Sequence, residues 1–204
     1  MRILKMYPTS INEKYVDTLV SALREGAVII YPTDTLYALA CDAFNNRAIE
    51  KICKIKGLDP DRNTLSIVCS DISQASEYVR IDNHAFKMLK KYLPGPFTFI
   101  LPAATTLPKV FKGRKTVGLR VPDNSIATAI ASSLGNPLMS TSVQIDEDEP
   151  YESAMPESLA MKYEGLADYI IDAGDGGIVP STVVDITDST SPEVLREGKG
   201  EFDE

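Results

Sequence analysis

Three short runs of serine and threonine, together with three isolated cations, are the residues of this 204-residue chain that could do chemistry. Each hydroxyl run stands beside the predicted end of a strand, so a single cavity could collect all three. Hydroxyls, backbone amides and a few fixed cations are what a phosphate-bearing or zwitterionic ligand requires. Serine and threonine at strand ends can also simply satisfy the local backbone. The residues are Thr33 and Thr35, then Ser140, Thr141 and Ser142, then Ser181 and Thr182, with Lys56, Arg120 and Arg196.

Several other catalytic constellations are missing from the sequence. It contains neither a Walker loop nor a GxGxxG motif, so a nucleotide would not bind in the manner of a P-loop or a Rossmann fold. His84 is the only histidine, which argues against a Ser-His-Asp triad and against a histidine-rich metal centre. Cys41, Cys53 and Cys69 form no CxxC pair, so we expect buried thiols and no metal site.

The first hydroxyl run must be positioned by the stretch AVIIYPTDTLYA, which spans Ala27 to Ala38. Its apolar, largely β-branched start predicts a strand that is buried on both faces. Pro32 removes a ladder donor and ends that strand, which leaves the turn Thr33–Thr35 at the carboxyl end, where open α/β sheets place ligands. Alternatively, a residue of this turn caps a short helix over Thr35–Ala40.

The cation Lys56 ends a helix that the apolar spacing predicts over Asn45–Lys56. It follows Ile49 by seven residues and Ile52 by four, and therefore projects on the apolar side of that helix. A lysine in this position either snorkels out to water or serves a lined pocket. Gly57 then stops the helix.

Strands alternate with helices through most of the chain, which indicates a single α/β domain over residues 1–204 with a central sheet flanked by helices. No window holds the roughly 18 consecutive apolar residues of a membrane helix, so we expect a cytoplasmic protein with no membrane partner. The other predicted strands cover Arg2–Tyr7, Leu65–Cys69, Phe97–Leu101, Val117–Val121, Leu138–Met139, Tyr169–Asp172, Val183–Ile186 and Val194–Arg196; the other helices cover Asn12–Glu25, Asp71–Tyr78, Asp82–Leu93 and Asn124–Leu134, and one begins near Pro156.

Seven segments resemble, in order, the YrdC/YciO family, which includes the threonylcarbamoyl-AMP synthases. The similarity covers roughly Glu13 to Gly200, and it is greatest toward the YciO branch. One segment alone would not be specific, whereas seven in order are. The segments are YPTDTLYALA, KGLDPDRNTLSIV, PGPFTFIL, VGLRVPDN, PLMSTS, PSTVVDIT and VLREGKG.

The resemblance implies a YrdC-like α/β fold with a twisted sheet around an open cavity. It also implies that L-threonine, bicarbonate and ATP with Mg²⁺ give threonylcarbamoyl-AMP and pyrophosphate, a step toward threonylcarbamoyladenosine in tRNA. A threonine carbamate is its own nucleophile, so such a protein needs only positioning and charge stabilisation at the α-phosphate. By this resemblance threonine would be held by Thr33, Thr35, Arg120 and Ser181, and the nucleotide by Lys56, Ser140, Ser142 and Arg196, with Lys56 as the catalytic cation.

Two positions depart from the pattern of the synthases. Lys56-Gly57-Leu58 stands where they typically have Lys-Gly-Arg, and Ser142-Val143-Gln144 where they have Ser-Ala-Asn. One phosphate-facing cation is therefore absent from the motif, and Arg62 is the candidate substitute.

The alternative function is an RNA-binding module with the same fold and little or no synthase activity. Its partner would be tRNA or double-stranded RNA, bound at the basic segment Leu107–Arg120; an exposed basic hairpin with no partner is the other interpretation. The net charge of −8 argues against tight nonspecific binding to nucleic acid. A third candidate is a transferase acting on a different amino acid. The cations of the RNA hypothesis are Lys109, Lys112, Arg114 and Lys115.

Overall fold

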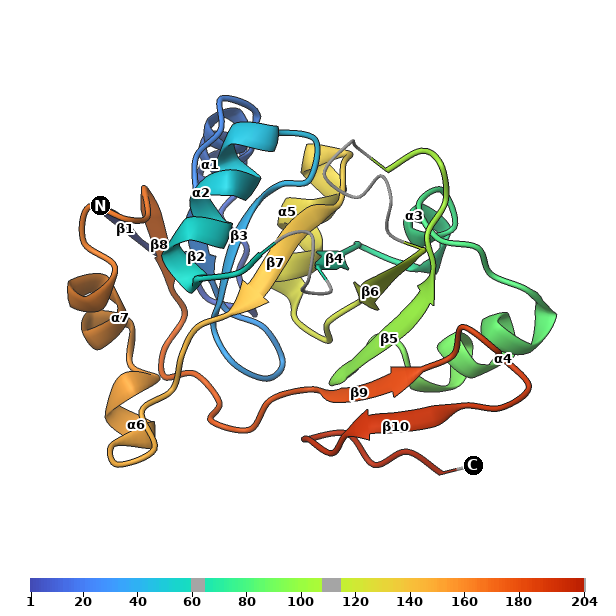
Figure 1. Ribbon diagram of the computed structural model, residues 1–204. Coiled ribbons are helices and arrows are strands. Elements are labelled where there is room, and N and C mark those ends of the chain that lie inside the picture. The colour runs from blue at the N-terminus through green and yellow to red at the C-terminus, as the bar shows by residue number, and fades with distance from the viewer. Residues whose placement is uncertain (60–64, 108–114, 204) are drawn as a thin grey trace.

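The computed structural model describes residues 1–59, 65–107 and 115–203, and the ten strands of this part form one mixed sheet (Figure 1). The strand order is β1-β8-β2-β3-β7-β4-β6-β5-β9-β10. The strands are β1 Arg2–Lys5, β2 Ile29–Tyr31, β3 Ala38–Asp42, β4 Ser66–Val68, β5 Phe97–Pro102, β6 Thr116–Arg120, β7 Leu138–Ser142, β8 Tyr169–Asp172, β9 Thr182–Asp185 and β10 Glu193–Arg196. The helices are α1 Glu13–Arg24, α2 Asn46–Lys56, α3 Ile72–Ala75, α4 Asn83–Tyr92, α5 Ser125–Leu134, α6 Pro150–Ser153 and α7 Pro156–Lys162.

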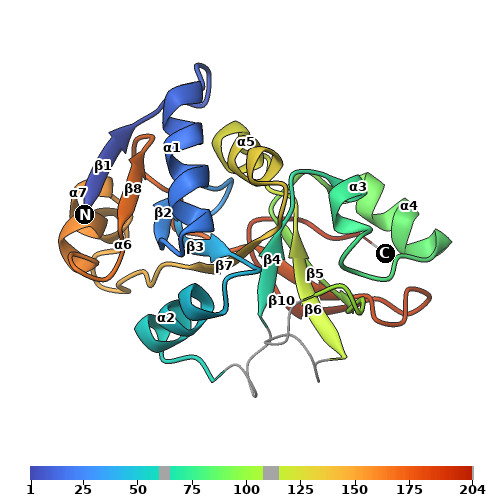
Figure 2. The ribbon, with the colours of Figure 1, turned by 90° about the horizontal axis from the view of Figure 1, so that it is seen from above.

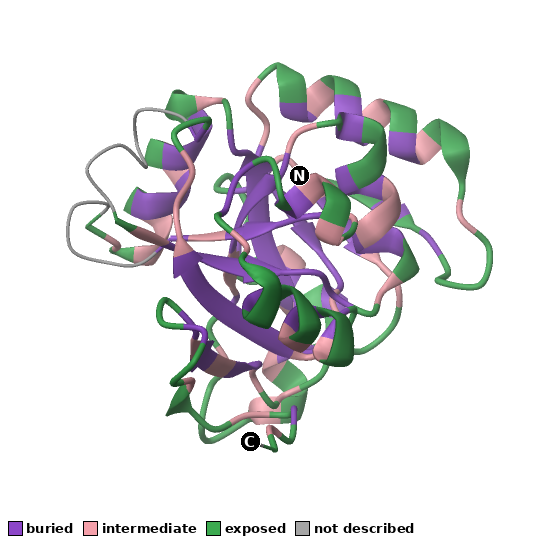
Figure 3. Cartoon of the chain, turned by 90° about the vertical axis from the view of Figure 1, so that its right-hand side faces the viewer, coloured by how far each residue is buried: buried purple, intermediate pink, exposed green. Residues whose placement is uncertain are grey.

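Helices cover both faces of the sheet, as a mixed α/β architecture requires. Helices α1 and α5 lie side by side on one face, and α2 lies on the other (Figure 2). Leu23 of α1 and Ile130 of α5 share one buried cluster with Ile29, whereas Ile52 of α2 shares a second cluster with Ile30. Figure 3 shows the same division as a buried sheet beneath helices whose outer faces are exposed. The predicted α/β fold is therefore confirmed.

Strand β2 is the strand that the sequence predicts immediately before the first hydroxyl run. Ile29, Ile30 and Tyr31 are completely buried, and consecutive residues enter opposite clusters, which confirms the prediction of a strand covered on both faces. The predicted short helix over Thr35–Ala40 is wrong. Ala38 begins β3, which pairs antiparallel with both β2 and β7. A local helical pattern cannot anticipate these two ladders, which pair the backbone of Ala38–Asp42 with neighbouring strands.

Two further differences concern β7 and the region that follows it. The hydroxyl run Ser140–Ser142 lies within β7 rather than beyond its end. The predicted helix near Pro156 is α7, but a short helix before it, α6, was not predicted. Pro150 occupies the first turn of α6, a position that proline tolerates because that turn needs no backbone donor.

Helix α2 carries Lys56 at its last position, and its two ends are set by local chemistry. The side chain of Asn45 accepts a hydrogen bond from the backbone N–H of Ala48 at 3.1 Å and so caps the first turn. Gly57 follows in the left-handed conformation, with φ 62°, which favours glycine and ends the helix as predicted. These two ends fix the point from which the Lys56 side chain leaves the helix.

We expect Asn45→Ala to lower the free energy of unfolding by about 1 kcal/mol, because the first turn of α2 loses its side-chain acceptor. For a chain of this size the midpoint of thermal unfolding should fall by about 2–4 °C. Differential scanning calorimetry measures both quantities. Asn83→Ala is the matched control, because Asn83 is an exposed first-turn residue of α4 that follows its cap Asp82. Equal effects of the two substitutions would contradict the capping role of Asn45.

The three cysteines are buried, as predicted. Burial raises the pKa of the Cys41 and Cys69 thiols, which keeps them protonated. Among the described residues no helix is long and apolar enough to span a membrane.

Candidate functional site

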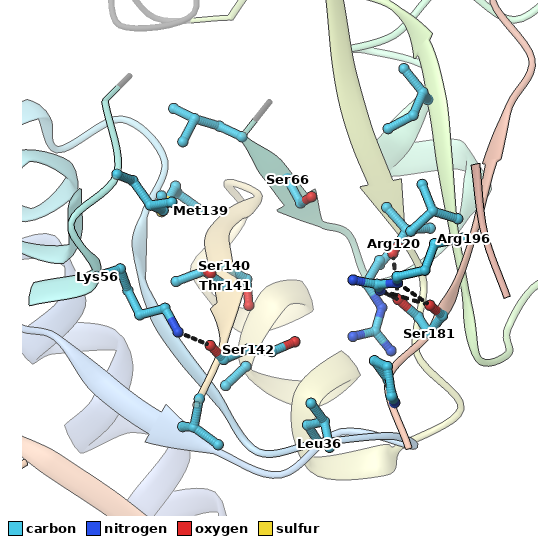
Figure 4. A pocket seen from close by; sticks show the side chains of 18 residues that line it. Leu36, Lys56, Ser66, Arg120, Met139, Ser140, Thr141, Ser142, Ser181 and Arg196 are labelled. Atoms are coloured by element: carbon cyan, nitrogen blue, oxygen red, sulfur yellow. Dashed lines mark hydrogen bonds between the residues drawn. The ribbon is translucent and has the colours of Figure 1, made fainter. Parts of the chain in front are cut away.

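A cavity of about 460 Å³ lies where the end of α2 meets strands β4, β5, β6, β7, β9 and β10 (Figure 4). No carboxylate lines it within the part of the chain that the structure describes. The polar side chains of its wall are hydroxyls and cations, so the wall suits an anion. The polar lining residues are Lys56, Ser66, Thr98, Arg120, Ser140, Thr141, Ser142, Ser181 and Arg196, and the apolar ones are Leu36, Ala38, Leu58, Leu65, Ile100, Met139, Val143, Pro180 and Val183.

Arg120, the last residue of β6, is the most firmly held of the three cations. Its Nη2 donates to Asp34 Oδ1 at 2.7 Å and to Thr35 Oγ1 at 3.1 Å. Only 8% of each side chain of the Arg120–Asp34 pair is exposed. The Nε of Arg120 is buried and has no hydrogen-bond partner among the described residues. A buried charged donor without an acceptor is costly, and a ligand oxygen in the cavity would satisfy it.

Arg196 of β10 lies beside Arg120 on the same wall of the cavity (Figure 4). Its Nη2 donates to the carbonyl oxygen of Ser181 at 2.7 Å, and the Ser181 hydroxyl is 2.8 Å from that of Thr98. Partial burial and then the positive charge of Arg120 lower the pKa of Arg196. The two positively charged guanidinium groups repel each other. An anion that contacts both would relieve this repulsion and would be bound more tightly than by either group alone.

Lys56 approaches from the opposite wall (Figure 4). Its Nζ donates to the carbonyl oxygen of Ser142 at 2.8 Å, and the described lining holds no carboxylate that could neutralise its charge. The sequence left open whether Lys56 extends out to water or serves a lined pocket. The structure supports the second interpretation, because Lys56 lines the cavity. Burial and then the positive charge of Lys162 lower the pKa of Lys56, which makes this amine easier to deprotonate than an ordinary lysine.

The lowered pKa of Lys56 leads to a prediction about pH. Lys162→Gln removes one positive charge and should raise the pKa of Lys56, so acetylation of Lys56 by acetic anhydride should require a higher pH. Mass spectrometry of the modified peptide across a pH series measures this profile. Lys162→Arg keeps the charge and is the control. An unchanged profile in Lys162→Gln would show that the charge at position 162 does not act on Lys56.

Strand β7 supplies hydroxyls to the cavity because Ser140, Thr141 and Ser142 all line it. The Ser140 hydroxyl lies 2.9 Å from the phenol oxygen of Tyr31. Burial raises the pKa of Tyr31 to about 12, so the phenol stays neutral and can donate to Ser140. Tyr31 of β2 therefore orients the Ser140 hydroxyl, which lines the cavity.

Six of the eight predicted site residues line this one cavity, and Thr33 and Thr35 do not. Thr33 uses its hydroxyl inside its own turn, where it accepts from the N–H of Thr35 and donates to the carbonyl of Leu36. Both threonines line a neighbouring hollow of about 630 Å³ with Asp34 and Lys199. Thr35 still touches the site through its bond to Arg120. The expectation that one cavity collects all three hydroxyl runs is therefore wrong for the first run, whose hydroxyls are engaged behind the wall.

The comparison with protein families identifies the relatives of this fold. The family model of Sua5, YciO and YrdC, described as "Telomere recombination", matches residues 21–198. The chain belongs to the Sua5/YciO/YrdC family. The resemblance carried by the seven sequence segments is thereby confirmed.

Relatives within the Sua5/YciO/YrdC family include two groups that differ in length. YciO of Escherichia coli (strain K12) is 40% identical over 198 residues, which are 96% of this chain and 95% of YciO. The crystal structure of E. coli YciO matches with a TM-score of 0.89 at 37% identity and covers 98% of both chains. These values show that this chain and YciO have the same extent and the same fold.

The second group consists of longer proteins. The threonylcarbamoyl-AMP synthase of Bacillus subtilis (strain 168) is 33% identical over 193 residues, which are 93% of this chain and 55% of the synthase. The crystal structure of Pyrococcus abyssi Sua5 complexed with L-threonine matches with a TM-score of 0.83 at 28% identity and covers 97% of this chain and 58% of Sua5. This chain therefore spans a little over half the length of these synthases.

The positions that depart from the family's synthase pattern differ in their relation to the cavity. Leu58 lines it, whereas Gln144 is exposed and does not. Arg62, the candidate substitute cation, lies outside the described residues, as do Lys109, Lys112 and Arg114 of the RNA hypothesis; Lys115 is described and exposed.

The sequence analysis did not identify Asp34 as a residue of the site. It weighed Asp34 as a helix cap, but no helix follows, and the carboxylate instead holds Arg120 and accepts from the backbone N–H of Asp123 at 3.1 Å. A buried strand arginine needs a carboxylate partner, and this requirement is the signal that could have found Asp34. Thr98 and Ser66 were also missed because each is a lone hydroxyl within a strand.

Proposed function

We propose that this protein is a threonylcarbamoyl-AMP synthase-like nucleotidyltransferase whose substrates are L-threonine, bicarbonate and ATP. The family membership supports the class of reaction, as do the B. subtilis synthase and the Sua5 structure complexed with L-threonine. The observation that carries the proposal is Arg120, whose buried Nε has no partner among the described residues and which lines a cavity whose described lining has three cations and no carboxylate. Such a donor is pre-organised for an anionic oxygen.

In this proposal threonine and the nucleotide contact different residues of the cavity. Arg120 binds the carboxylate of threonine, with Ser181 beside it, and Thr35 and Thr33 contribute by holding the turn behind Arg120. The nucleotide lies against the other residues, which are Lys56, Ser140, Ser142 and Arg196. This division uses all eight predicted site residues and gives Thr33 and Thr35 an indirect role.

The reaction needs no covalent intermediate on the protein. The threonine amine attacks the carbon of bicarbonate, and water leaves to give a carbamate. A carbamate oxygen then attacks the α-phosphorus of ATP while pyrophosphate leaves. Negative charge grows on the phosphoryl oxygens, and Lys56 and Arg196 stabilise it. No imidazole is required, which agrees with the exposed position of His84 on α4.

Magnesium enters this proposal only as part of the nucleotide substrate. The described residues contain no group of three histidine, cysteine or acidic side chains that could hold a metal ion, and the described cavity lining offers hydroxyl oxygens but no carboxylate. Mg²⁺ commonly keeps several waters and binds through substrate phosphates. The lining therefore fits an ion that the triphosphate brings with it. When bound, such an ion neutralises phosphate charge.

Leu58 sets a limit on the strength of nucleotide binding. It places an apolar side chain in the lining where the synthases typically carry arginine. The cations that contact the triphosphate are then Lys56 and Arg196, so ATP should bind more weakly than in a protein with the extra guanidinium group.

A pyrophosphate-release assay tests the proposed function. Purified protein is incubated with MgATP, L-threonine and bicarbonate, and each component is omitted in turn. The proposal predicts release only from the complete mixture, and less release when L-serine replaces L-threonine. Release that is independent of threonine and bicarbonate, or no release from folded protein, would contradict the proposal.

A further inference from the structure

Lys199 makes a contact that joins two distant parts of the sheet. Its Nζ donates to the carbonyl oxygen of Asp34 at 2.6 Å. Asp34 follows β2, whereas Lys199 follows β10, which pairs with β9. Six strand intervals separate β2 from β9 in the sheet order, a distance of about 29 Å in a flat sheet at 4.8 Å per interval. The contact therefore connects the turn after β2 to the far end of the sheet.

The backbone around Lys199 is fixed independently of its side chain. The N–H of Lys199 donates to the carbonyl of Pro180 at 2.8 Å, and the Thr182 hydroxyl donates to the carbonyl of Gly200 at 2.6 Å. A Cβ added at Gly198 would collide with backbone atoms of Pro180 and Ser181, so only glycine permits this approach. The segment is thus anchored to β9, and the Lys199 side chain is its connection to Asp34.

The turn that receives Lys199 is the one that holds Arg120. Asp34 uses one carboxylate oxygen for Arg120, the other for the N–H of Asp123, and its carbonyl for Lys199. Thr35, the next residue, also accepts from Arg120. A displacement of this turn would therefore move both acceptors of the guanidinium group together.

We infer that Lys199 is a positioning residue that latches the Thr33–Thr35 turn to the segment after β10 and so fixes the guanidinium of Arg120. The kinetic consequence rests on the proposed function, in which Arg120 binds threonine. The mechanical consequence does not, because it concerns only how firmly Arg120 is held. Lys199 itself does not line the main cavity and faces the neighbouring hollow.

The test combines a chemical readout with a kinetic one on Lys199→Met, Lys199→Arg and the control Lys14→Met, which removes an exposed lysine of α1. Phenylglyoxal modifies accessible arginines, and peptide mass spectrometry gives its rate at Arg120. In Lys199→Met we expect that rate to rise about three- to tenfold, as for the loss of one typical hydrogen bond, because this contact is exposed. The KM for threonine should rise by a similar factor with little change in kcat.

Lys199→Arg should restore both values, because it retains a charged donor, and Lys14→Met should leave them unchanged. Calorimetry verifies that the variants are folded, and Lys199→Gln replaces Lys199→Met if that variant is not. An unchanged phenylglyoxal rate at Arg120 in folded Lys199→Met would overturn the inference. If the wild-type protein shows no threonine-dependent reaction, the proposed function fails, and the phenylglyoxal rates still decide the role of Lys199.

Discussion

Arg120→Ala is expected to reduce threonine-dependent pyrophosphate release by at least about 100-fold, because truncating one partner of a buried, hydrogen-bonded charge pair costs several kcal/mol. The substitution removes a guanidinium group that lines the proposed site and whose buried Nε has no partner among the described residues. The kinetic constants for threonine and for ATP measure the effect. Arg47→Ala, which removes an exposed arginine of α2, is the control and should behave as the wild type.

The same substitution leaves the buried carboxylate of Asp34 without its cation, so we expect a loss of about 3–5 kcal/mol in the free energy of unfolding. The double variant Arg120→Ala/Asp34→Asn removes that orphaned charge and should recover part of the stability while activity stays lost. This combination separates binding from folding. Recovery of activity in the double variant would contradict the direct role of Arg120.

Lys56→Met is expected to lower kcat/KM for ATP by about 100-fold, the usual effect of deleting one donor that stabilises transition-state charge. The methionine retains most of the aliphatic stem, and the lost partner is a single carbonyl oxygen. The midpoint of thermal unfolding should therefore stay within about 3 °C of the wild type.

Lys54→Met is the matched control, because Lys54 is an exposed lysine one half-turn earlier on α2. Its kinetics and stability should equal those of the wild type. If both substitutions lower kcat/KM equally, the effect comes from the general charge of α2, and the specific role of Lys56 is wrong.

The parts of the fold that sequence could predict are those fixed by neighbouring residues. The β-branched run before Pro32 gave β2, and Asn45 with Gly57 marked the ends of α2 to within one residue. These signals are local, because a cap or a proline acts within one turn of the chain. The cations Lys56, Arg120 and Arg196 could be selected for a similar reason, since a charge within an apolar pattern stands out.

The parts that could not be predicted depend on contacts between distant segments. Ala38–Asp42 is apolar enough for a buried helix or a strand, and only its pairing with β2 and β7 decides between them. Thr33 and Thr35 were assigned to the cavity by their residue type. Which side of a turn a hydroxyl faces depends on the turn's own hydrogen bonds, and these direct both threonines behind the wall.

The role of Asp34 in the site also depends on contacts between distant segments. Its partners Arg120, Asp123 and Lys199 lie 86, 89 and 165 residues away in sequence. No local pattern encodes such a convergence, which arises when the sheet brings the ends of β2, β6 and β10 around one cavity. The residues that hold the reactive cations are thus harder to predict than the cations themselves.

We propose that the protein converts threonine, bicarbonate and ATP into threonylcarbamoyl-AMP and pyrophosphate. Incorporation of isotope from bicarbonate tests this reaction most directly. Protein, MgATP and L-threonine are incubated with ¹³C-bicarbonate, and the nucleotide products are separated and weighed by mass spectrometry. We expect threonylcarbamoyl-AMP that carries one ¹³C, in equal amount to the pyrophosphate released, and none with Arg120→Ala. Unlabelled AMP as the only nucleotide product, or label whose amount is the same in Arg120→Ala, would contradict it.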